Sequence, residues 1–384
     1  MSKARVLIVG GGIGGLTAAI ALIQRGFEVL VYEQAPELRE FGAGVSISQN
    51  GSRVLIELGL QRALEQVALR PASWTRRLFD TGRSWPLGMS LWVVHRGDLH
   101  QALALALERR APGAVHIGAR CVGFEQDTNG VTLLLDNGER VHGDALVGAD
   151  GVHSRIRREL FGEGRATFTG YMAWRAVTPV ERVPPRLREQ GFTVWVGPSG
   201  QIVTYPLRQG KLLNFAATVR RNDWLIESWS AAGTVGECRN DFADWHEDVL
   251  AIIDAIQIPY KWALIGRPPL RHCSVGHVTL LGDAFHPTLP IGGQGANMAI
   301  EDSVILARCL EASTTIVEAL QRYEAARLNR TSRIVQTAFE RLDRTRDELA
   351  DPNLANAFME RLVASASGDP HDWIHQYDSV SAPV

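Results

Sequence analysis

The chain has 384 residues, of which 45% are hydrophobic and 21% are charged. These values are ordinary for a soluble globular enzyme with a substantial core, and the length allows two or three domains or one large domain with an insertion. The formal net charge of −2 gives no reason to expect nucleic acid or an acidic membrane surface as a partner, and no apolar run is long enough to span a bilayer.

The chain opens with a βαβ pattern. Residues 4–9 form a short apolar run rich in branched side chains, residues 13–25 have helical periodicity, and residues 28–33 are again strand-like. The crossover in such a unit is right-handed in nearly all proteins. We therefore expect two neighbouring strands with a helix packed on them at the start of the chain.

A glycine-rich turn joins the first strand to the helix. Gly10, Gly12 and Gly15 occupy the three positions of the dinucleotide-binding fingerprint, which serve the tight turn, the approach of a pyrophosphate and close helix–strand packing. Glu33 ends the next strand, where its carboxylate is placed to accept hydrogen bonds from an adenosine ribose. The pattern does not separate FAD from NAD, because both present the same ADP half, and it could also be an incidental glycine-rich turn.

The middle of the chain changes from helices to strands. Helices are predicted near 50–67 and 97–110, a hairpin between 121 and 141, and a buried strand at 144–147. Beyond these, strands separated by turns rich in Pro and Gly predict an antiparallel sheet that interrupts the dinucleotide-type domain. The strands predicted for this sheet cover residues 171–180, 192–196, 201–205 and 212–219.

The segment Gly282–Asn297 follows an apolar, strand-like run and leads into an amphipathic helix. Gly292, Gly293 and Gly295 would let a flat ligand lie against bare backbone, and the start of the helix favours negative charge on that ligand. Asp283 suits sugar-like hydroxyls better than phosphate, which its carboxylate would repel. The segment therefore suits a flavin, although a plain strand–turn–helix connection would have the same pattern.

The rest of the chain is predicted to be mostly helical, with one long helix near 316–346 and a polar, frayed tail after Gly368. Met1–Ala4 leads directly into the first strand without a signal peptide. Together with the cysteines, which we interpret as reduced and mostly buried thiols without metal-ligand spacing, this predicts a cytoplasmic protein with no metal site. The four cysteines are Cys121, Cys238, Cys273 and Cys309.

Two further motifs each have a functional and a structural interpretation. Asp150-Gly151 follows the strand at 144–147, and Ser154 with the arginines after it could equally cap and decorate a surface helix. Arg96 could reach a phosphate or a ring edge, or it could be a surface cation at a helix start.

In this order, the motifs resemble those of the single-component FAD-dependent aromatic hydroxylases, especially the branch that contains salicylate and hydroxybenzoate hydroxylases. The resemblance covers nearly the whole chain. It is carried by residues 10–15 with Glu33, Arg39–Gly44, His95–Leu99, Asp150-Gly151, Trp174-Arg175 and Gly282–Asn297.

The resemblance and the predicted elements together give an α/β fold class. We expect a Rossmann-like FAD-binding domain at 1–165 and 275–345, interrupted by an antiparallel-sheet substrate domain at 166–274 and followed by C-terminal helices. Residues 346–384 would form a helical or polar tail. No second dinucleotide domain is visible, which fits a family whose NADH or NADPH binds transiently.

The family implies a role for each matched position. The ADP moiety would be held by Gly10, Gly12, Gly14, Gly15 and Glu33, and the cofactor would be contacted by Arg39 and Arg96. Asp150 belongs to a motif linked with both FAD and the pyridine nucleotide, and Asp283 would bind the ribitol or pyrophosphate region. The backbone facing the flavin ring would be that of Gly293, Gly295, Ala296 and Asn297.

The resemblance also implies a reaction. NADH or NADPH would reduce FAD, O2 would add at the flavin C4a position, and the resulting hydroperoxide would hydroxylate a small phenolic or heteroaromatic acid of the salicylate or hydroxybenzoate type. The site must then exclude water and activate the ring. The apolar character of the inserted sheet suits the first demand. Its aromatic residues are Tyr171, Trp174, Phe192, Trp195, Tyr205 and Phe215.

Tyr205 and Gln201 are the candidate catalytic and substrate-contacting side chains, and Pro290 and Ile291 are the candidate wall of the substrate site. His286 is interpreted as structural. Hydroxynicotinate hydroxylases of similar sequence place histidines where this chain has Ser46 and Ile291, and that substrate class stays open. The motifs also leave open epoxidation, N-hydroxylation, an NAD-dependent dehydrogenase and a non-catalytic flavin protein. We expect a monomer or homodimer.

Overall fold

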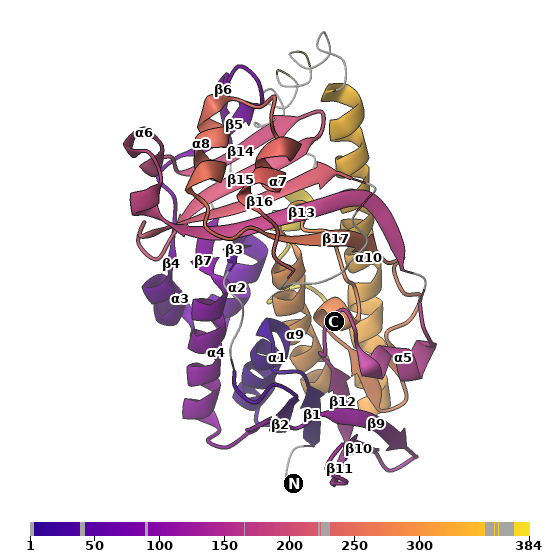
Figure 1. Ribbon diagram of the computed structural model, residues 1–384. Helices are drawn as coiled ribbons and strands as arrows, with labels where there is room; N and C mark the ends of the chain where they lie inside the picture. The colour runs from indigo at the N-terminus through magenta and orange to yellow at the C-terminus, as the bar shows by residue number, and fades with distance from the viewer. Residues whose placement is uncertain are drawn as a thin grey trace.

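The computed structural model places two sheets one above the other, with helices around the lower sheet and against the outer face of the upper one (Figure 1). None of the helices in the described part of the chain combines the length and hydropathy that crossing a membrane requires. The described residues are 4–38, 43–88, 91–164, 166–221, 223, 231–349, 357, 360 and 372–384.

The lower sheet has six strands and is mostly parallel. β1 pairs in parallel with β2 and with β12, and β12 pairs in parallel with β19, so the expected βαβ start is confirmed. The strands, in sheet order, are β18 (Ser274–Val275), β19 (Val278–Leu280), β12 (Ala145–Gly148), β1 (Arg5–Val9), β2 (Glu28–Glu33) and β8 (Val115–Ile117).

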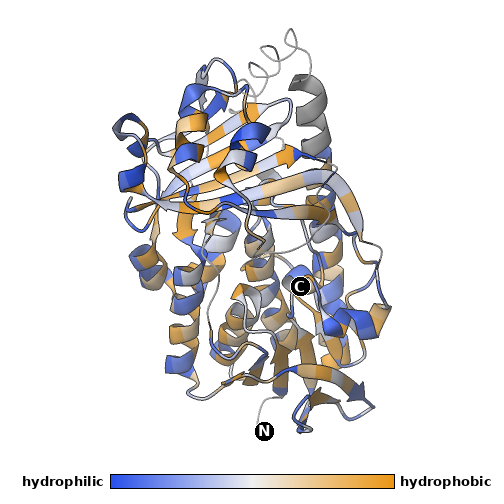
Figure 2. Ribbon diagram, viewed as in Figure 1, coloured by the Kyte–Doolittle hydropathy of each residue, from blue (hydrophilic) through white to orange (hydrophobic). Residues whose placement is uncertain are grey.

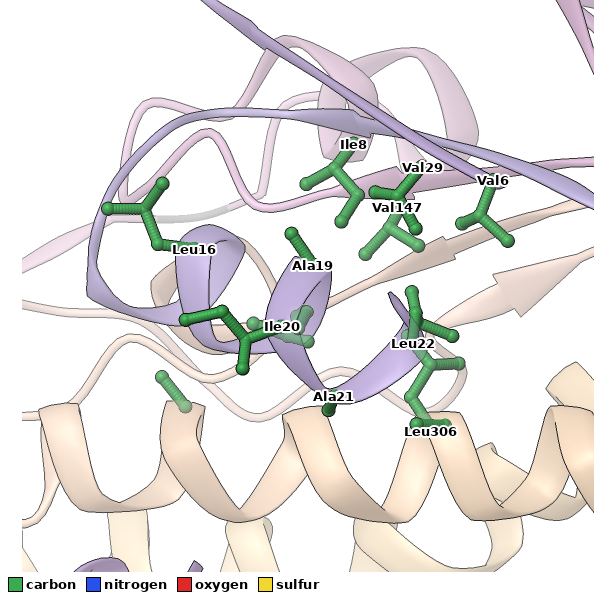
Figure 3. Close-up of a cluster of buried hydrophobic side chains, with 14 of the residues drawn as sticks. Val6, Ile8, Leu16, Ala19, Ile20, Ala21, Leu22, Val29, Val147 and Leu306 are labelled. Carbon is green, nitrogen blue, oxygen red and sulfur yellow. The ribbon is translucent and has the colours of Figure 1, made fainter. Parts of the chain in front are cut away.

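The core of this layer lies on both sides of helix α1 (Ile13–Gln24). Figure 3 shows α1 between strand residues such as Ile8 and helix α9 (Gly295–Ala312), where Leu22 lies near Leu306. Burying each such aliphatic side chain stabilises the fold by about 2 kcal/mol. This packing on two sides explains why α1 is apolar almost all round.

The other elements of the lower layer extend this core. The helices are α2 (Gln49–Glu57), α3 (Gln61–Val67), α4 (Arg96–Arg110), α5 (Arg155–Phe161) and the long α10 (Ile316–Leu349). The predicted hairpin is a three-stranded sheet of β9 (Cys121–Gln126), β10 (Val131–Leu135) and β11 (Arg140–Gly143). A second small sheet contains β3 (Gly44–Ile47), β7 (Trp92–His95) and β4 (Ala68–Leu69).

The upper sheet has seven strands, and all its pairings are antiparallel except that of β14 with β5. It takes two strands from residues 74–86, which lie outside the segment expected to form it. The strands, in sheet order, are β17 (Tyr260–Gly266), β13 (Thr167–Pro179), β16 (Leu212–Arg220), β15 (Gly200–Leu207), β14 (Phe192–Gly197), β5 (Trp74–Leu78) and β6 (Ser84–Pro86).

The two faces of the upper sheet have different partners, because side chains alternate between the faces of a strand. Figure 2 shows apolar and more polar residues interspersed along the strands of this sheet. The outer face carries Trp174, Trp195 and Phe215, which pack against helices α7 (Val235–Asp241) and α8 (Glu247–Ala255). Three of the aromatic residues predicted to keep the site dry are therefore core residues on the side away from it. The short elements α6 (Pro185–Arg188) and η1 (Val180–Arg182) complete this layer.

The expected frayed tail is wrong for residues 372–384. They include the short helix α12 (Asp372–His375), and Ile374 is only 2% exposed in a cluster with Met298 and Ile334. Arginines of neighbouring helices donate hydrogen bonds to backbone carbonyls of this segment. The polar composition of the segment suggested fraying. It could not reveal that arginines elsewhere in the chain bind the segment's backbone.

Candidate active site

The glycine-rich turn combines two tight contacts with one open position. A methyl group on Gly10, whose φ is +109°, would lie 2.3 Å from the Ala149 carbonyl oxygen, and one on Gly15 would lie 2.0 Å from the Gly10 carbonyl oxygen. A methyl group on Gly12 would meet no atom of the described residues within 4 Å. These environments match the three roles of a dinucleotide fingerprint, with Gly12 leaving free backbone for a pyrophosphate.

Glu33 and His100 hold this turn from two sides. Glu33 at the end of β2 accepts hydrogen bonds from the Gly11 amide (2.7 Å) and the Ala35 amide (2.8 Å), and its remaining lone pairs can accept from ribose hydroxyls. His100, on α4 and 3% exposed, lies with Nε2 2.6 Å from the Gly11 carbonyl oxygen. The sequence does not mark His100, because nothing local distinguishes it from another buried helix residue.

Gly14 has a packing role. A methyl group there would lie 2.7 Å from Leu281 Cδ2 and 3.1 Å from Ala299 Cβ, so its lack of a side chain lets α1 approach α9. Arg39, the other fingerprint-side residue expected to touch the cofactor, lies outside the described residues.

The Asp150 side chain caps helix α5. Its carboxylate accepts hydrogen bonds from Ser154 Oγ (2.5 Å) and the Arg155 amide (2.7 Å), and Ser154 Oγ accepts one from the Arg157 amide (2.9 Å). Burial raises the pKa of Asp150, and these hydrogen bonds oppose the rise. The capping interpretation therefore describes the side chains, while the backbone at Ala149 lies against Gly10 of the fingerprint.

Arg157 ties this motif to the short helix η2 (Gly282–Ala284). Its guanidinium donates to the Val152 carbonyl (2.6 Å) and to the Ala284 carbonyl (3.4 Å). Arg157 therefore links the Asp150 motif to η2. The local cluster of arginines had suggested a solvated helix face instead.

Asp283 lies at the centre of a positive field. Desolvation by surrounding protein raises the pKa of its carboxyl, while His286, Arg96 and Arg157 act in the opposite direction. Its side chain is nevertheless exposed to solvent. A carboxylate that is accessible but largely surrounded by protein can accept hydrogen bonds from a ligand's hydroxyls. Arg96 is close enough to Asp283 to act on its charge.

The flavin loop, defined here as residues Gly292–Asn297, has a left-handed backbone that favours glycine at its start and open amides at its end. Gly292 and Gly293 have φ of +84° and +64°, and a methyl group on Gly293 would lie 2.6 Å from Ser46 Oγ. The N-cap residue of α9, Gln294, makes no side-chain cap to the helix. The first-turn amides and the helix dipole can therefore stabilise negative charge on a ligand.

Asn297 positions the flavin loop instead of presenting its side chain to a ligand. Its Oδ1 accepts from the Ser48 amide (3.0 Å), and its Nδ2 donates to the carbonyls of Ser46 (3.0 Å) and Gly293 (2.8 Å). The side chain is fully buried. The backbone of Asn297 is therefore the part that could face a cofactor, which is the role that the family resemblance implies.

A buried ion network lies beneath the loop. Asp302 accepts from His286 Nε2 (2.6 Å), the Gly282 amide (3.0 Å) and Arg327 Nε (2.7 Å), and Arg327 also pairs with Glu301 at 2.7 Å. Burial alone would raise the pKa of Asp302, but His286 and Arg327 lower it to about 2. His286 thus has the structural role predicted for it. Through Asp302 it holds η2 in place, and η2 carries Asp283.

The inner face of the upper sheet carries a small apolar floor. The pairing register aligns Val203 with Ala216 and Arg175, and all three are half-buried. The row on one side contains Gln201 and Thr218, and the row on the other side contains Tyr205 and Asn214. Gln201 and Tyr205 therefore share the face that meets the lower layer.

Tyr205 is tightly packed and lies in the field of a cation, Arg175. Its ring stacks on Phe192 with centroids 5.2 Å apart, and a methyl group on Gly44 of β3 would lie 2.6 Å from its hydroxyl oxygen. Burial raises the pKa of Tyr205, and Arg175 opposes the rise. Burial lowers the pKa of Arg175 to about 10, with its guanidinium 4.7 Å from the Trp262 ring centroid.

Two buried polar atoms on this face lack hydrogen-bond partners among the described residues. They are Nδ2 of Asn214, which is 1% exposed, and Oγ1 of Thr218, which is 5% exposed. Buried donors and acceptors are normally paired, so both are candidates to bind a ligand. Neither was singled out from the sequence, because only the register reveals that they flank the floor.

The stretch before the flavin loop meets the same face. Leu289 and Ile291 pack with Tyr171, Ala173 and Trp262 of the upper sheet. Pro290 between them accepts a hydrogen bond from the Gly293 amide (3.3 Å). The predicted wall at 290–291 therefore adjoins the inner face of the sheet.

Comparison with known proteins identifies the family. A family model described as FAD binding domain matches residues 3–338. The chain belongs to the single-component FAD-dependent aromatic hydroxylases. This hydroxylase has the α/β fold expected of the family.

Three relatives illustrate the match. The chain is 36% identical to the 3-amino-4-hydroxybenzoate 2-monooxygenase PtmB3 of Streptomyces platensis, covering 100% of this chain and 98% of that protein. It is 36% identical to the 3-hydroxybenzoate 6-hydroxylase of Polaromonas naphthalenivorans (strain CJ2), covering 87% and 86%. The structure of Klebsiella pneumoniae HpxO complexed with FAD and uric acid aligns with a TM-score of 0.82 and 28% identity, covering 97% and 95%.

Proposed function

We propose that this hydroxylase uses NADH or NADPH and O2 to hydroxylate a small aromatic acid of the hydroxybenzoate type. The observation that carries the proposal is the floor of Val203 and Ala216, framed by Arg175 and Tyr205, on the sheet face against which the stretch before the flavin loop packs. A floor of small side chains suits an aromatic ring, and the half-buried Arg175 guanidinium suits a carboxylate. The relatives named for hydroxybenzoates support the same class.

The residues that would hold FAD fit its parts. Gly12 leaves backbone free where a pyrophosphate would bind, Glu33 would accept from the ribose, and Asp283 would accept from the ribitol hydroxyls. The open amides at the start of α9 would stabilise negative charge on the flavin ring. When bound and reduced, FAD supplies the activation of O2 from which one oxygen atom reaches the ring. The protein's part is to position the ring and to exclude water.

Arg175 would bind the substrate carboxylate. Its guanidinium lies in surroundings that disfavour the charged form, since its pKa is lowered to about 10. An aromatic carboxylate placed beside it would form a charge-assisted hydrogen bond in a low-dielectric site, where such a bond is strong. Nδ2 of Asn214 and the Thr218 hydroxyl, which lack partners among the described residues, can complete the polar contacts.

Tyr205 would donate a hydrogen bond rather than act as a base. Because burial raises its pKa, the hydroxyl stays protonated at neutral pH. A protonated hydroxyl on the floor can stabilise the phenolate form of a substrate, which activates the ring toward oxygen. Gln201, on the same face, would make a second polar contact.

Arg175→Met tests the assignment of the carboxylate site. We expect KM for 3-amino-4-hydroxybenzoate or 3-hydroxybenzoate to rise about a hundredfold, because a charged hydrogen bond is lost. FAD affinity should stay within about twofold, since the residues proposed to hold FAD lie on other elements. An unchanged KM, or a KM that rises equally for a phenol without a carboxylate, would contradict the assignment.

The choice between NADH and NADPH, the cytoplasmic location and the state as a monomer or homodimer stay predictions. Hydroxynicotinate is the second substrate class to screen, although Ser46 and Ile291 stand where the resemblance places histidines for it.

A further inference from the structure

The C-terminal segment, residues 372–384, is held to the lower layer by four arginines. Each guanidinium donates to backbone carbonyls of the segment, so the interaction does not depend on its side chains. The bonds are Arg330 to Trp373 and Ile374 (3.2 and 2.8 Å), Arg53 to Gln376 (2.7 Å), Arg308 to Ser379 (2.8 Å) and Arg322 to Val384 (2.5 Å).

Arg330 differs from the other three because it also reaches the buried ion network. It makes a two-pronged pair with Glu301, at 2.8 and 2.7 Å. On its other side, the ring of Tyr377 lies 3.9 Å from the guanidinium carbon. The side chain of Arg330 is 8% exposed and that of Glu301 is fully buried. A cation–π contact and charge-assisted bonds in such surroundings are stronger than at an exposed site.

A chain of buried side chains continues from Glu301 to the flavin loop. Asn50 Nδ2 donates to Glu301 (2.6 Å) and to Gln294 Oε1 (3.1 Å). Gln294 Nε2 donates in turn to the carbonyl of Gly292 (3.3 Å) and to Ser48 Oγ (3.3 Å). Asn50 and Glu301 are fully buried and Gln294 is 4% exposed, so water does not compete for these bonds.

We propose that the C-terminal segment positions the flavin loop through Arg330, Glu301, Asn50 and Gln294. Glu301 lies between two arginines, and the clamp of the C-terminal segment on Arg330 holds its carboxylate toward Asn50. Asn50 then orients Gln294, which fixes the Gly292 carbonyl and leaves the amides at the start of α9 for the cofactor. This rests on the proposed placement of the flavin ring at that loop.

Tyr377→Ala tests the proposal, with Tyr377→Phe as the rescue and Arg308→Met as the control. Arg308 binds the same segment, whereas the ion pairs with Glu301 come from Arg327 and Arg330. FAD affinity is measured by fluorescence titration of each apoprotein, together with its melting temperature. We expect Tyr377→Ala to raise the Kd for FAD about tenfold. Tyr377→Phe, which keeps the ring, should stay within about twofold of the parent.

The control decides whether the effect passes through the arginines that pair with Glu301, since the Tyr377 ring lies over both Arg330 and Arg327. Arg308→Met should lower the melting temperature while leaving the Kd for FAD within about twofold of the parent. If Arg308→Met weakens FAD binding as much as Tyr377→Ala, or if Tyr377→Ala leaves the Kd unchanged, the proposal fails.

A double-mutant cycle adds a readout that a purely structural role would not move. If Tyr377 and Gln294 act along one chain, Gln294→Ala should remove most of the effect of Tyr377→Ala on the Kd for FAD. Independent, multiplying effects would overturn the proposal. Should Tyr377→Ala not fold, the same cycle with Tyr377→Leu replaces it. None of these measurements requires an aromatic substrate, so failure of the proposed hydroxylation would leave this test intact.

Discussion

Gly12 and Gly15 lie in the same turn, yet an added methyl group should have opposite consequences at the two positions. At Gly15 it would overlap the Gly10 carbonyl oxygen, whereas at Gly12 it would point into open space. We expect Gly15→Ala to lower the free energy of unfolding of the apoprotein by about 3 kcal/mol or more. Gly12→Ala should change it by less than about 0.5 kcal/mol.

The order should reverse when FAD is added. Gly12→Ala fills the space of the pyrophosphate, so its Kd for FAD should rise about tenfold or more, measured by titration of the folded apoprotein. Equal stability losses in the two variants, or unimpaired FAD binding by Gly12→Ala, would contradict the assignment of these glycines.

Asp283→Asn should weaken FAD binding and slightly stabilise the apoprotein. Desolvation raises the pKa of Asp283 above the unfolded value of 3.8, so its ionisation opposes folding above that pH. The gain in melting temperature of the variant should therefore appear only as pH rises above about 4. The Kd for FAD should rise about tenfold, because a charged acceptor is lost. A variant less stable than the parent at pH 7 would show that the field of Arg96 and Arg157 outweighs desolvation.

At this scale, the sequence predicts residues whose role is local and leaves out those whose role is tertiary. The positive φ of Gly10 follows from a pattern of neighbouring residues. His100 and Arg157 contact residues far along the chain, so no local pattern marks them. The Thr218 hydroxyl is placed beside the floor by strand register, which no local pattern reveals either.

Helices α9 and α10 are joined by fully buried ion pairs, in which Arg327 of α10 contacts Glu301 and Asp302 of α9. Asp302→Asn leaves Arg327 without one counter-charge and should lower the free energy of unfolding at pH 7 by about 3 kcal/mol. The partners of Asp302 hold its folded pKa near 2, below the unfolded value of 3.8. Its contribution is therefore complete above about pH 4 and is lost as pH falls toward 2.

Urea unfolding of the parent and of Asp302→Asn across acidic pH measures this contribution. The two stability curves should converge as pH falls below about 4, since the parent loses what the variant already lacks. Curves that stay parallel through that range would show that the carboxylate does not carry the stability.

The periodicity of hydrophobic residues and the positions of turn residues predicted most elements correctly, including the βαβ start, the hairpin and the inserted strands. They did not predict that β5 and β6 join the upper sheet, because strand pairing is non-local and these strands precede the inserted segment. They also missed the docking of residues 372–384, which depends on backbone carbonyls and arginines elsewhere in the chain.

At the scale of the whole molecule, the two layers contact each other where β3 meets the floor of the upper sheet. The Gly44 amide donates to Asn214 Oδ1 (2.8 Å), and Gly44 has no side chain to displace Tyr205. We expect Gly44→Ala to push Tyr205 aside and to raise KM for the aromatic acid about tenfold. The Kd for FAD, measured in parallel, should stay within about twofold. A change confined to FAD binding would contradict the proposed position of the substrate.

The reaction itself is the most direct test of this arrangement of FAD loop and substrate floor. Purified protein reconstituted with FAD is incubated with NADH or NADPH, isotopically labelled O2 and, in turn, 3-amino-4-hydroxybenzoate, 3-hydroxybenzoate, salicylate and 6-hydroxynicotinate. Mass spectrometry then follows the aromatic product. We predict that a hydroxybenzoate-type acid gains one oxygen atom and that this atom carries the label. Substrate-stimulated NAD(P)H oxidation with no labelled oxygen in any product would contradict the proposed hydroxylation.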